Sequence, residues 1–546
     1  MSNGRSNRWV VPAALVFTVM WFALLWGRPL YDPDEGRYAE IPREILAGGD
    51  WLIPHLDGLV YLEKPPLQYW LSALALRTFG ESELSARLWT GLFGYLSLMV
   101  VAAVARHLWG REAALRAALL LAGSVLFLLL GHQLTLDMTL GFWLIASLGC
   151  FIRSQTGQGP PGAGRAWMLG CWATMACAVL TKGLVGVLIP GATLSIYILW
   201  QRDWGLLRRL SWGAGLVLFT ALAAPWFVLA ARAQPEFLQF FFIREHFQRF
   251  LTPIEERSEP WWFFIPVLIV GILPWVTRAA RVLAVDWRGS APPGQFDAVR
   301  LLWIWSVFVL LFFSLSNAKL IPYILPALPT LALLAARPQP RDWSGHLVAG
   351  AALSLLFALG VLAYASAIWA SPRALELVLR LRPALIALSA ALTAGALGCL
   401  WAARRGRIPE ALAALSAGWC GAVVALTVGA WGVGDLFSAR DLAALIARQP
   451  NRDAPVYSVQ NYQQSLPFYL QRTVTLVDYR DEFTLGLRQA PDRGIPSLQE
   501  FAARWRALPD GLAVMPRATR ERLAMSGVPM REIGCFPTRL CLMSRQ

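Results

Sequence analysis

Charged side chains are scarce in this sequence. Only 15% of its 546 residues are Asp, Glu, Lys or Arg, well below the roughly 25% of soluble domains. Hydrophobic residues make up 56% of the chain, and the mean hydropathy is +0.49. These values exclude a soluble globular enzyme and predict a polytopic α-helical membrane protein.

Several common motifs are also missing. The sequence contains neither a G-x-G-x-x-G nor a P-loop, which argues against a nucleotide site. It has no compact metal-ligand motif such as H-x-x-x-H, so we expect that no cofactor is required, although a divalent metal stays possible. No small-residue cleavage site follows the first apolar run, which therefore predicts a retained first span.

The net charge of +15 does not indicate nucleic acid binding. The 49 basic residues exceed the 34 acidic ones, but the arginines are spread through short loops between apolar runs. Positive-inside topology and acidic lipid head groups explain such a pattern better than nucleic acid does. We therefore expect membrane lipids, and no nucleic acid, among the partners.

Cysteine is rare, and two of the seven cysteines differ from the rest. Five lie in apolar segments and are typical of small core residues. Cys535 and Cys541 flank a proline turn in the polar C-terminal tail. They either form a disulfide in an oxidising compartment or are strand core residues, and the sequence leaves both open.

About thirteen apolar stretches have the character of membrane spans, although some are short for a bilayer that needs roughly 20 residues. They run over residues 9–26, 88–105, 113–131, 138–152, 166–180, 184–200, 210–231, 261–276, 301–315, 321–336, 346–369, 383–401 and 411–431.

Residues 65–80 decide on which side of the membrane the later loops lie, because every later loop changes sides if this segment spans the membrane. If this segment lies on the membrane surface, the basic loops all fall on one side, which the positive-inside rule makes cytoplasmic. The alternative is an ordinary short span. The basic loops are marked by Arg5, Arg8, Arg106, Arg111, Arg153, Arg165, Arg202, Arg208, Arg209, Arg278, Arg281, Arg288, Arg337, Arg341, Arg404, Arg405 and Arg407.

This topology gives a transmembrane catalytic domain over residues 1–432, with a cytoplasmic N-terminus, a first periplasmic loop at 28–87 and a second at 232–260. After Trp431 the composition becomes that of a soluble domain. Alternating strand and helix patterns over residues 433–546 predict a small periplasmic α/β domain. Within it, Ser497 and Glu500 form a capping-box signature before a helix.

Ionisable residues gather in the loops that this topology turns outward, where polar groups of a membrane protein tend to be functional. Each also has a structural interpretation: a lysine can extend to the interface, and a lone histidine is more often structural than a ligand. The set comprises Asp32, Asp34, Glu35, Arg37, Glu40, Arg43, Asp57, Glu63, Lys64, Asp137, Lys182, Arg244, His246, Arg249, Lys319 and Tyr323, of which Asp34, Arg37, Glu63 and Lys64 lie in the most distinctive sequence.

The first loop carries the most specific pattern. It contains D-E-x-R-Y-A-E-I-x-R-E at 34–44, G-D-W-x-x-P-H at 49–55 and Y-x-E-K-P-P at 61–66. This loop resembles the first periplasmic loop of bacterial aminoarabinose transferases, which belong to the protein O-mannosyltransferase clan of GT-C glycosyltransferases. Ala86–Leu88, Asp137 and the run 316–326 give weaker support. Gly36 replaces the threonine frequent in the family, and we expect this to affect helix capping.

The resemblance implies transfer of 4-amino-4-deoxy-L-arabinose from undecaprenyl phosphate to lipid A phosphates at the inner membrane, with resistance to polymyxin and cationic antimicrobial peptides. The implied catalytic residues are Asp34, Glu63 and Asp137. Binding of the phosphate and the lipid donor would fall to Arg37, Lys64, Lys182, Arg244, Arg249, Lys319 and Tyr323. Weak candidates for metal ligands are Glu63 and His246.

Two other functions fit parts of the sequence. A transferase of the same clan could move galactosamine or mannose from a polyprenyl phosphate to lipid or protein. A transporter of a lipid-linked sugar fits less well, because transporters tend to carry charges near mid-bilayer and to show repeats, which this sequence lacks. The exact sugar, the acceptor phosphate, the identity of any catalytic base and the oligomeric state stay open.

Overall fold

The computed structural model describes residues 9–157, 160–252, 258–338, 343–367, 371–536 and 540–545. Arg5, Arg8, Arg341 and part of the 232–260 loop lie outside these ranges. The chain forms two compact units. The helical unit comprises Met1–Leu25 and Trp89–Gly429, and the α/β unit comprises Trp26–Leu88 and Ala430–Gln546. The first loop thus belongs to the same unit as the C-terminal residues, a grouping that the division at residue 432 does not anticipate.

Eight helices in the described ranges are long and apolar enough to cross a membrane, so the chain is a multi-pass membrane protein. They are α4 (Glu83–Trp109), α7 (Leu136–Gln155), α8 (Ala163–Lys182), α11 (Trp212–Ala233), α15 (Ala298–Leu315), α17 (Trp343–Ala365), α18 (Pro372–Arg404) and α19 (Ile408–Trp431). Shorter apolar segments are α1 (Val10–Ala23), α9 (Val185–Gln201) and Ile321–Ala336, which holds η3 (Ile321–Ile324) and α16 (Ala327–Ala336).

The expected count of thirteen spans is not confirmed by the helices of the described ranges. Two of the apolar stretches are broken helices. One divides at Gly123 and Ser124 into α5 (Arg111–Ala122) and α6 (Val125–Leu130). The other is interrupted around Pro274: α13 (Phe264–Gly271) ends before this proline, and α14 (Val276–Val285) begins after it. The remaining short elements are α10 (Leu206–Arg209), the π-helix η1 (Gln239–Gln248), α12 (Arg249–Leu251) and η2 (Asp286–Arg288).

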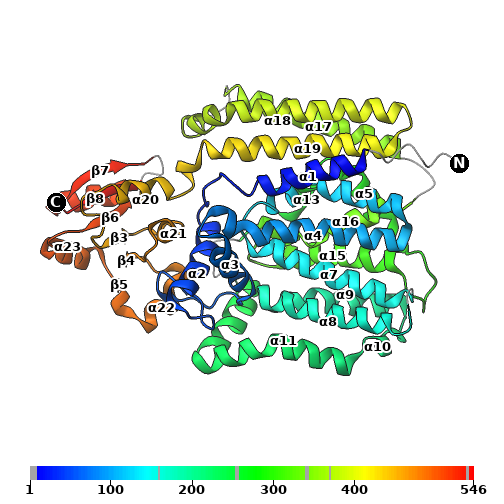
Figure 1. Cartoon of the computed structure of the whole chain (residues 1–546), viewed down its shortest axis with the longest axis horizontal. Helices are drawn as coiled ribbons and strands as arrows, with labels where there is room; N and C mark the ends of the chain where they lie inside the picture. The colour runs from blue at the N-terminus through cyan, green and yellow to red at the C-terminus, as the bar shows by residue number, and fades with distance from the viewer. Residues whose placement is uncertain are drawn as a thin grey trace. The chain divides into compact units, whose positions relative to one another are not determined.

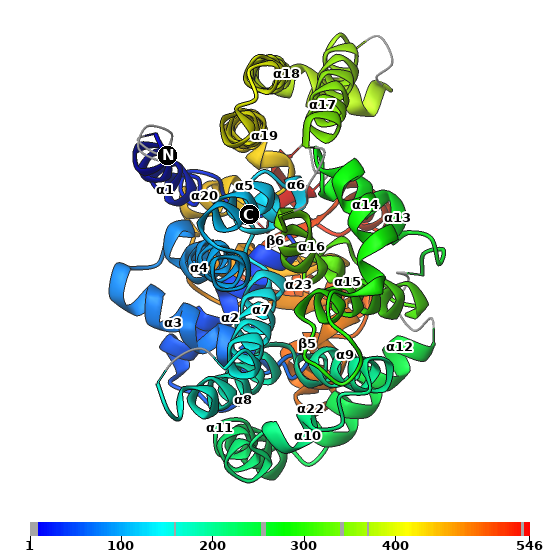
Figure 2. The same ribbon diagram turned by 90° about the vertical axis from the view of Figure 1, so that its right-hand side faces the viewer.

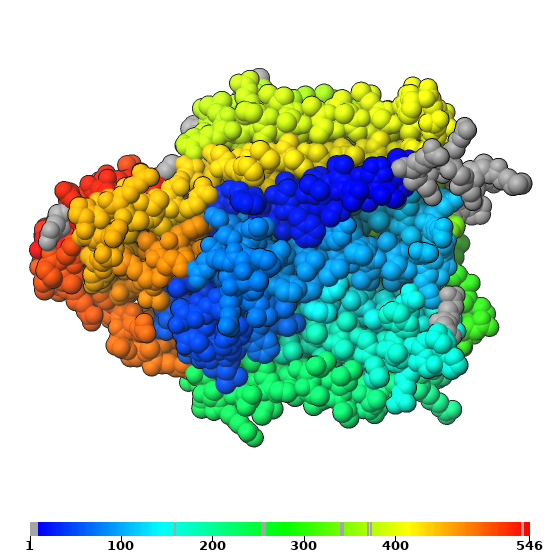
Figure 3. All heavy atoms as spheres, in the orientation of Figure 1, coloured from blue at the N-terminus to red at the C-terminus, as the bar shows by residue number. Residues whose placement is uncertain are grey.

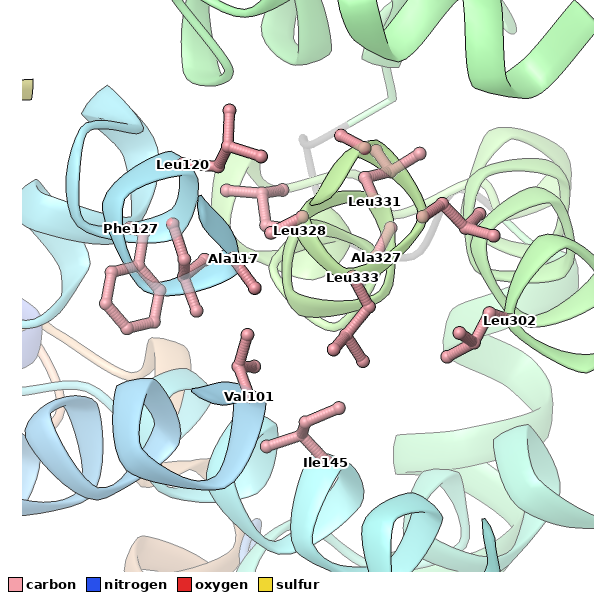
Figure 4. Packing of buried hydrophobic residues seen from close by; sticks show 14 of the residues in the cluster. Val101, Ala117, Leu120, Phe127, Ile145, Leu302, Ala327, Leu328, Leu331 and Leu333 are labelled. Carbon is pink, nitrogen blue, oxygen red and sulfur yellow. The ribbon is translucent and has the colours of Figure 1, made fainter. Parts of the chain in front are cut away.

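Helix α16 is the centre of the main apolar core, and all ten of its residues are buried. Figure 4 shows Leu328 and Leu331 of α16 near Leu120 of α5, and Leu333 on the side that faces Ile145 of α7. The end-on view in Figure 2 shows α17, α18 and α19 as a separate group of helices. Apolar clusters hold both groups together, and a few interhelical hydrogen bonds add to them, such as that from the Trp419 indole to the Ser354 hydroxyl at 2.9 Å.

The α/β unit contains a six-stranded sheet of order β5-β4-β3-β6-β8-β7 (Figure 1). The strands are β3 (Val456–Val459), β4 (Thr475–Val477), β5 (Gly494–Ile495), β6 (Leu512–Pro516), β7 (Arg531–Cys535) and β8 (Leu540–Ser544). The first four are parallel, and β7 and β8 form an antiparallel hairpin. Cys535 and Cys541 form a disulfide across that hairpin, which resolves the alternative that the sequence left open.

Helices between the strands follow the alternation expected from the sequence. They are α20 (Arg440–Ala447), α21 (Leu466–Leu470), α22 (Thr484–Gln489), α23 (Leu498–Ala507) and α24 (Arg517–Met525), with short turns η4 (Gly434–Leu436), η5 (Asp481–Phe483) and η6 (Pro491–Arg493). The Ser497 hydroxyl accepts a hydrogen bond from the Glu500 N–H at 3.2 Å, so the predicted helix cap is confirmed.

The first loop contributes α2 (Asp34–Gly48), the two-residue strands β1 (His55–Leu56) and β2 (Leu59–Val60), and α3 (Leu67–Phe79) to this unit. Helix α3 has 13 residues, about 20 Å in length, which is too short for a bilayer core of about 30 Å. It packs against α2, where the fully buried Tyr69 stacks on Tyr38, whereas Phe79 is exposed.

Candidate functional site

Helix α2 is fixed in the α/β unit by a buried ion cluster around Glu35. This carboxylate is fully buried and accepts hydrogen bonds from Arg28 at 2.7 and 2.8 Å and from Arg87 at 2.8 and 2.8 Å. Burial acts to raise the pKa of Glu35, but the two guanidinium charges outweigh it and hold the pKa well below its usual range. Glu35 is therefore an ionised structural anchor.

The next residues of α2 join it to the C-terminal part of the unit. Asp32, directly before the helix, accepts hydrogen bonds from the Ser465 N–H at 2.6 Å and the Ser465 hydroxyl at 3.0 Å. A Cβ on Gly36 would lie 2.3 Å from the Ser465 nitrogen, so only glycine permits this contact. Gly36 is the third residue of α2, and its missing side chain allows this close approach of Ser465; its effect on helix capping stays a prediction.

Arg37 and Glu63 meet through a tyrosine. Arg37 donates to the Tyr61 hydroxyl at 3.4 Å, and that hydroxyl donates to the Glu63 carboxylate at 2.9 Å. Burial acts to lower the pKa of Arg37, but the surrounding Tyr61, Glu63 and Glu482 raise it, so the guanidinium stays charged. The Arg37 Nε is buried with no partner among the residues that the structure describes.

Asp34 lies in the first turn of α2, beside the same tyrosine-lined region. Its charge contributes to raising the pKa of Tyr38 and Tyr69, after the larger effect of burial. Asp34 makes no hydrogen bond or ion pair within the described part of the chain, and the buried Tyr69 hydroxyl has no hydrogen-bond partner there either. Polar atoms left in this state are where a polar ligand binds most readily.

Lys64 follows Glu63 directly and is partly buried. Its ammonium donates a hydrogen bond to the Glu63 carbonyl at 3.0 Å. Two prolines follow it, and the second, Pro66, is the N-cap residue of α3. The α/β unit therefore brings together Asp34, Arg37, Glu63 and Lys64 from the sequence-predicted set.

Glu482 is a member of this cluster that the sequence did not reveal. Its carboxylate lies 3.5 Å from the Arg37 guanidinium and also accepts a hydrogen bond from Gln464. Burial raises the pKa of Glu482 to about 7, although the charge of Arg37 acts to lower it. Glu482 follows Arg37 by more than 400 residues, and no local motif marks it.

A second cluster lies in the helical unit. Asp137, in the first turn of α7, forms an ion pair of 2.6 Å with Lys182, the last residue of α8. The Lys182 ammonium also lies 4.9 Å from the centre of the Tyr323 ring, a cation–π distance. Both charges are largely buried, with exposed side-chain fractions of 16% and 13%. Three predicted residues from three elements are thus brought together.

His246 positions the π-helix η1 against the end of α8. Its Nδ1 donates to the Phe241 carbonyl at 2.7 Å, and its Nε2 accepts from the Leu184 N–H at 3.2 Å. A Cβ on Gly183 would lie 2.5 Å from Nε2, so a larger residue would displace the ring. Both ring nitrogens have backbone partners, and metal ligation would require breaking one of these hydrogen bonds.

The remaining predicted cations lie in or near the same loops of the helical unit. Arg249 pairs with Glu245 at 2.9 Å, and Arg244 lies 5.3 Å from the Phe240 ring centre. Lys319 is 6% exposed and donates to the backbone carbonyls of Glu259 and Ser316. This geometry gives Lys319 a role in fixing its loop, and it gives no direct indication of phosphate contact.

Lysine is rare in this chain, and each lysine is one of the candidate site residues. Of the 49 basic residues, 46 are arginine and only three are lysine, namely Lys64, Lys182 and Lys319. All three belong to the predicted set. An ammonium is a compact point charge, whereas a guanidinium is a wide planar group, so the two are not interchangeable at a crowded site. A chain that otherwise uses arginine keeps lysine where the smaller cation fits.

Two protein-family models match this chain, and between them they cover several residues of the two clusters. The family model described as aminoarabinose transferase C-terminal domain matches residues 442–543. The model described as dolichyl-phosphate-mannose-protein mannosyltransferase matches residues 63–228. The second match covers Glu63, Lys64, Asp137 and Lys182, and the first covers Glu482.

Curated relatives agree with these matches. Undecaprenyl phosphate-alpha-4-amino-4-deoxy-L-arabinose arabinosyl transferase 1 of Sodalis glossinidius (strain morsitans) is 36% identical over 60% of this chain and 58% of its own length. The corresponding transferase of Edwardsiella ictaluri (strain 93-146) is 35% identical over 59% of this chain and 58% of its own length. These alignments span less than two thirds of the relatives.

A solved structure extends the similarity over the whole chain. The crystal structure of ArnT from Cupriavidus metallidurans bound to undecaprenyl phosphate is 33% identical, with a TM-score of 0.91 over 99% of this chain and 98% of that one. The apo structure gives 34% identity and a TM-score of 0.88 over 100% and 99%. The resemblance stated from the first loop is therefore confirmed: the chain has the GT-C fold and belongs to the aminoarabinose transferase family.

Proposed function

We propose that this protein transfers 4-amino-4-deoxy-L-arabinose from undecaprenyl phosphate to phosphate groups of lipid A. The observation that carries the proposal is the full-length similarity to ArnT with undecaprenyl phosphate bound. The two clusters of partly buried cations and carboxylates support it, because both the donor and the acceptor carry phosphate and the sugar carries an amine. The modified lipid A would lower the affinity of polymyxin and cationic peptides for the membrane.

The orientation is part of the proposal. We place the N-terminus in the cytoplasm and both the first loop and the C-terminal domain in the periplasm of the inner membrane. The arginine distribution supports this topology. The Cys535–Cys541 disulfide supports it independently, because disulfides persist in oxidising compartments such as the periplasm.

The chemistry needs cations more than a strong base. As the sugar leaves the donor, negative charge develops on the departing lipid phosphate, and a positioned cation stabilises that charge. In the α/β unit Lys64 is assigned this role, with Arg37 as a further phosphate contact. In the helical unit Lys182 and Arg249 are separate candidates for contact with a lipid phosphate. The acceptor phosphate has a second pKa of about 6, so it is largely ionised at neutral pH before any base acts.

The carboxylates then orient the reactants. Asp34 has no ion pair within the described residues, so it is available to the donor's ammonium or sugar hydroxyls. Glu63 accepts from Tyr61 and Asp137 pairs with Lys182, so each of these acids also fixes a neighbour. If a general base contributes, Asp34 is the first candidate.

We propose that no metal is needed. One group of side chains in the described ranges has the geometry to hold an ion, Glu532 with Cys535 and Cys541, and its two sulfurs are already joined in the disulfide. Sugar transfer by the purified protein should continue in EDTA. Loss of transfer that added divalent ion restores would contradict this part of the proposal.

Mass spectrometry of lipid A tests the function. The gene is expressed in a strain that makes the donor but lacks its own transferase, and lipid A should gain the mass of one aminopentose. Asp34→Ala and Lys64→Ala should abolish that gain while the protein still inserts. Asp453→Ala is the matched control, since the Asp453 side chain is 95% exposed. A hexosamine or hexose gain, or wild-type activity of Asp34→Ala, would refute the assignment.

A further inference from the structure

The helical unit contains an almost wholly apolar cavity of about 360 Å³ between α7, α8, α9, α11 and α15. Its wall includes Phe151, Met168, Trp172, Leu194 and Trp305. The Ser147 hydroxyl, which also belongs to the wall, is hydrogen-bonded to the carbonyl oxygen and the sulfur of Cys171. An apolar cavity of about 150 Å³ already binds benzene, so this larger one has room for part of an aliphatic chain.

The cavity opens between α9 and α11 to the lipid-facing surface. Gly191 of α9 and Trp212 and Leu216 of α11 belong both to its wall and to the exposed surface. Figures 1 and 2 show α8, α9 and α11 as neighbours with α10 at one end, and Figure 3 shows α11, in green, along the outer edge of the protein. In a membrane this opening faces acyl chains, which are therefore able to enter.

The loop beside the opening is basic and rich in tryptophan. Trp172 donates to the Leu210 carbonyl at 2.8 Å, and Trp212 donates to the Leu207 carbonyl at 2.8 Å, so both indoles tie the cavity mouth to α10. Arg208, within α10, is exposed, and its side chain forms no hydrogen bond or ion pair with the described residues. Arg202 is exposed as well, whereas Arg209 pairs with Asp203. Exposed tryptophan and arginine are typical of the head-group level of a membrane.

This basic rim lies at the opposite end of the helices from the Asp137–Lys182 cluster. Cys171, in the cavity wall, precedes Lys182 by eleven residues in the same helix, a separation of about 16 Å. Ser147 follows Asp137 by ten residues of α7, which gives about 15 Å in the same direction. A lipid whose phosphate contacts Arg208 therefore places its head group away from the Lys182 ammonium.

We propose that this cavity is a binding site for one anionic phospholipid, separate from the sugar-transfer site. One acyl chain occupies the apolar cavity, and the phosphate contacts the exposed arginines of the α9–α11 loop. The charge of the rim selects an anionic over a zwitterionic head group, and the apolar wall holds the chain. The site adds a lipid requirement to the protein that does not depend on which sugar it transfers.

Glycine positions provide matched variants for the test. A Cβ on Gly191 would meet no atom within 4 Å, so Gly191→Phe adds a side chain at the mouth without a clash. Gly213 of α11 is equally open but does not belong to the wall, so Gly213→Phe is the control. Gly191→Leu is a smaller second variant. A substitution at Gly215 is unsuitable, because its Cβ would lie 2.1 Å from Trp172.

Native mass spectrometry of the full chain in mild detergent is the measurement. Equal amounts of phosphatidylglycerol and phosphatidylcholine with identical acyl chains are added. The wild type and Gly213→Phe should retain phosphatidylglycerol preferentially, and Gly191→Phe and Gly191→Leu should lose about tenfold of the bound lipid. Arg208→Gln should lower the phosphatidylglycerol preference about fivefold, the factor for one basic residue near a lipid surface.

Three results would overturn the proposal. The first is equal lipid retention by the Gly191 and Gly213 variants, and the second is an unchanged lipid preference in Arg208→Gln. The third is displacement of phosphatidylglycerol from the wild type by undecaprenyl phosphate, which would make the cavity part of the donor site. Sugar transfer is not the readout, so failure here leaves the proposed transferase function unaffected.

Discussion

Replacing Glu35 by glutamine should destabilise the α/β unit strongly. The carboxylate is fully buried between two guanidinium groups and receives four hydrogen bonds of 2.7–2.8 Å from them. Glutamine removes the negative charge that both guanidinium groups contact and turns a donor towards one of them. Breaking a buried pair in this way costs about 3–5 kcal/mol, because the remaining charges stay buried without compensation.

The exposed pair Glu376–Arg380 is the matched control. It has the same residue types at 2.6 Å, but its side chains are 56% and 34% exposed. Glu376→Gln should therefore cost less than about 0.5 kcal/mol. With a shift of about 2–4 °C per kcal/mol for a unit of 150–250 residues, Glu35→Gln should lower the thermal midpoint of the detergent-solubilised protein by roughly 6–20 °C. Equal midpoints for the two variants would refute the role of Glu35 as an anchor.

The Glu35 cluster also determines how the stability of the folded protein depends on pH in acid. The pKa of Glu35 is lower in the folded state than in the unfolded chain, so its contribution to stability is complete above about pH 4.3. The contribution is lost as pH falls towards the folded pKa, because protonation then favours the unfolded chain. The Glu35→Gln variant has no such titration, so its midpoint should change less between pH 5 and pH 3 than that of the wild type.

Three further changes test other parts of the account. Burial raises the pKa of Asp57 to about 8, so the stability of the folded protein should fall as pH rises from about 4 to 8. The thermal midpoint of Asp57→Asn should therefore depend less on pH between pH 6 and 9 than that of the wild type, and an equal dependence would contradict this. Gly36→Ala should lower the free energy of unfolding by about 1–3 kcal/mol, because its Cβ would clash with the Ser465 backbone. Gly48→Ala, with open space around it, should be neutral or stabilising by up to about 1 kcal/mol. Similar thermal midpoints for the two variants would disprove the close contact. Lys182→Arg keeps the charge but puts a wide planar guanidinium in place of a compact ammonium at a largely buried position between Asp137 and Tyr323. Lipid A modification should therefore fall at least about tenfold, and wild-type activity would show that charge alone suffices.

Local patterns predicted the parts of the fold that depend on neighbouring residues. The helix cap at Ser497 and the alternation of strands and helices after residue 433 were both visible, because capping and side-chain periodicity are short-range properties. Strand β5 was missed because it has only two residues. Hydropathy could not show that two of the apolar runs are broken helices, interrupted near Gly123 and before Pro274.

Long-range pairing was not predictable from those patterns. The pairing of Asp32 with Ser465 and of Arg37 with Glu482 joins segments more than 400 residues apart, and no local signal specifies such a partner. The first-loop motif indicated acids and bases together, yet it could not separate Glu35, a buried anchor, from Asp34 beside it. That distinction depends on Arg87, which enters from the start of α4 and which the sequence marked only weakly.

The most direct test of the proposed chemistry uses the purified protein with synthetic undecaprenyl-phosphate-linked aminoarabinose and lipid A. Mass spectrometry of the products should show aminoarabinose on lipid A and free undecaprenyl phosphate with the wild type, and neither product above background with Lys64→Ala. Asp453→Ala should match the wild type. Wild-type product formation by Lys64→Ala, or no product with the intact protein, would contradict the assignment of this site to sugar transfer between lipid phosphates.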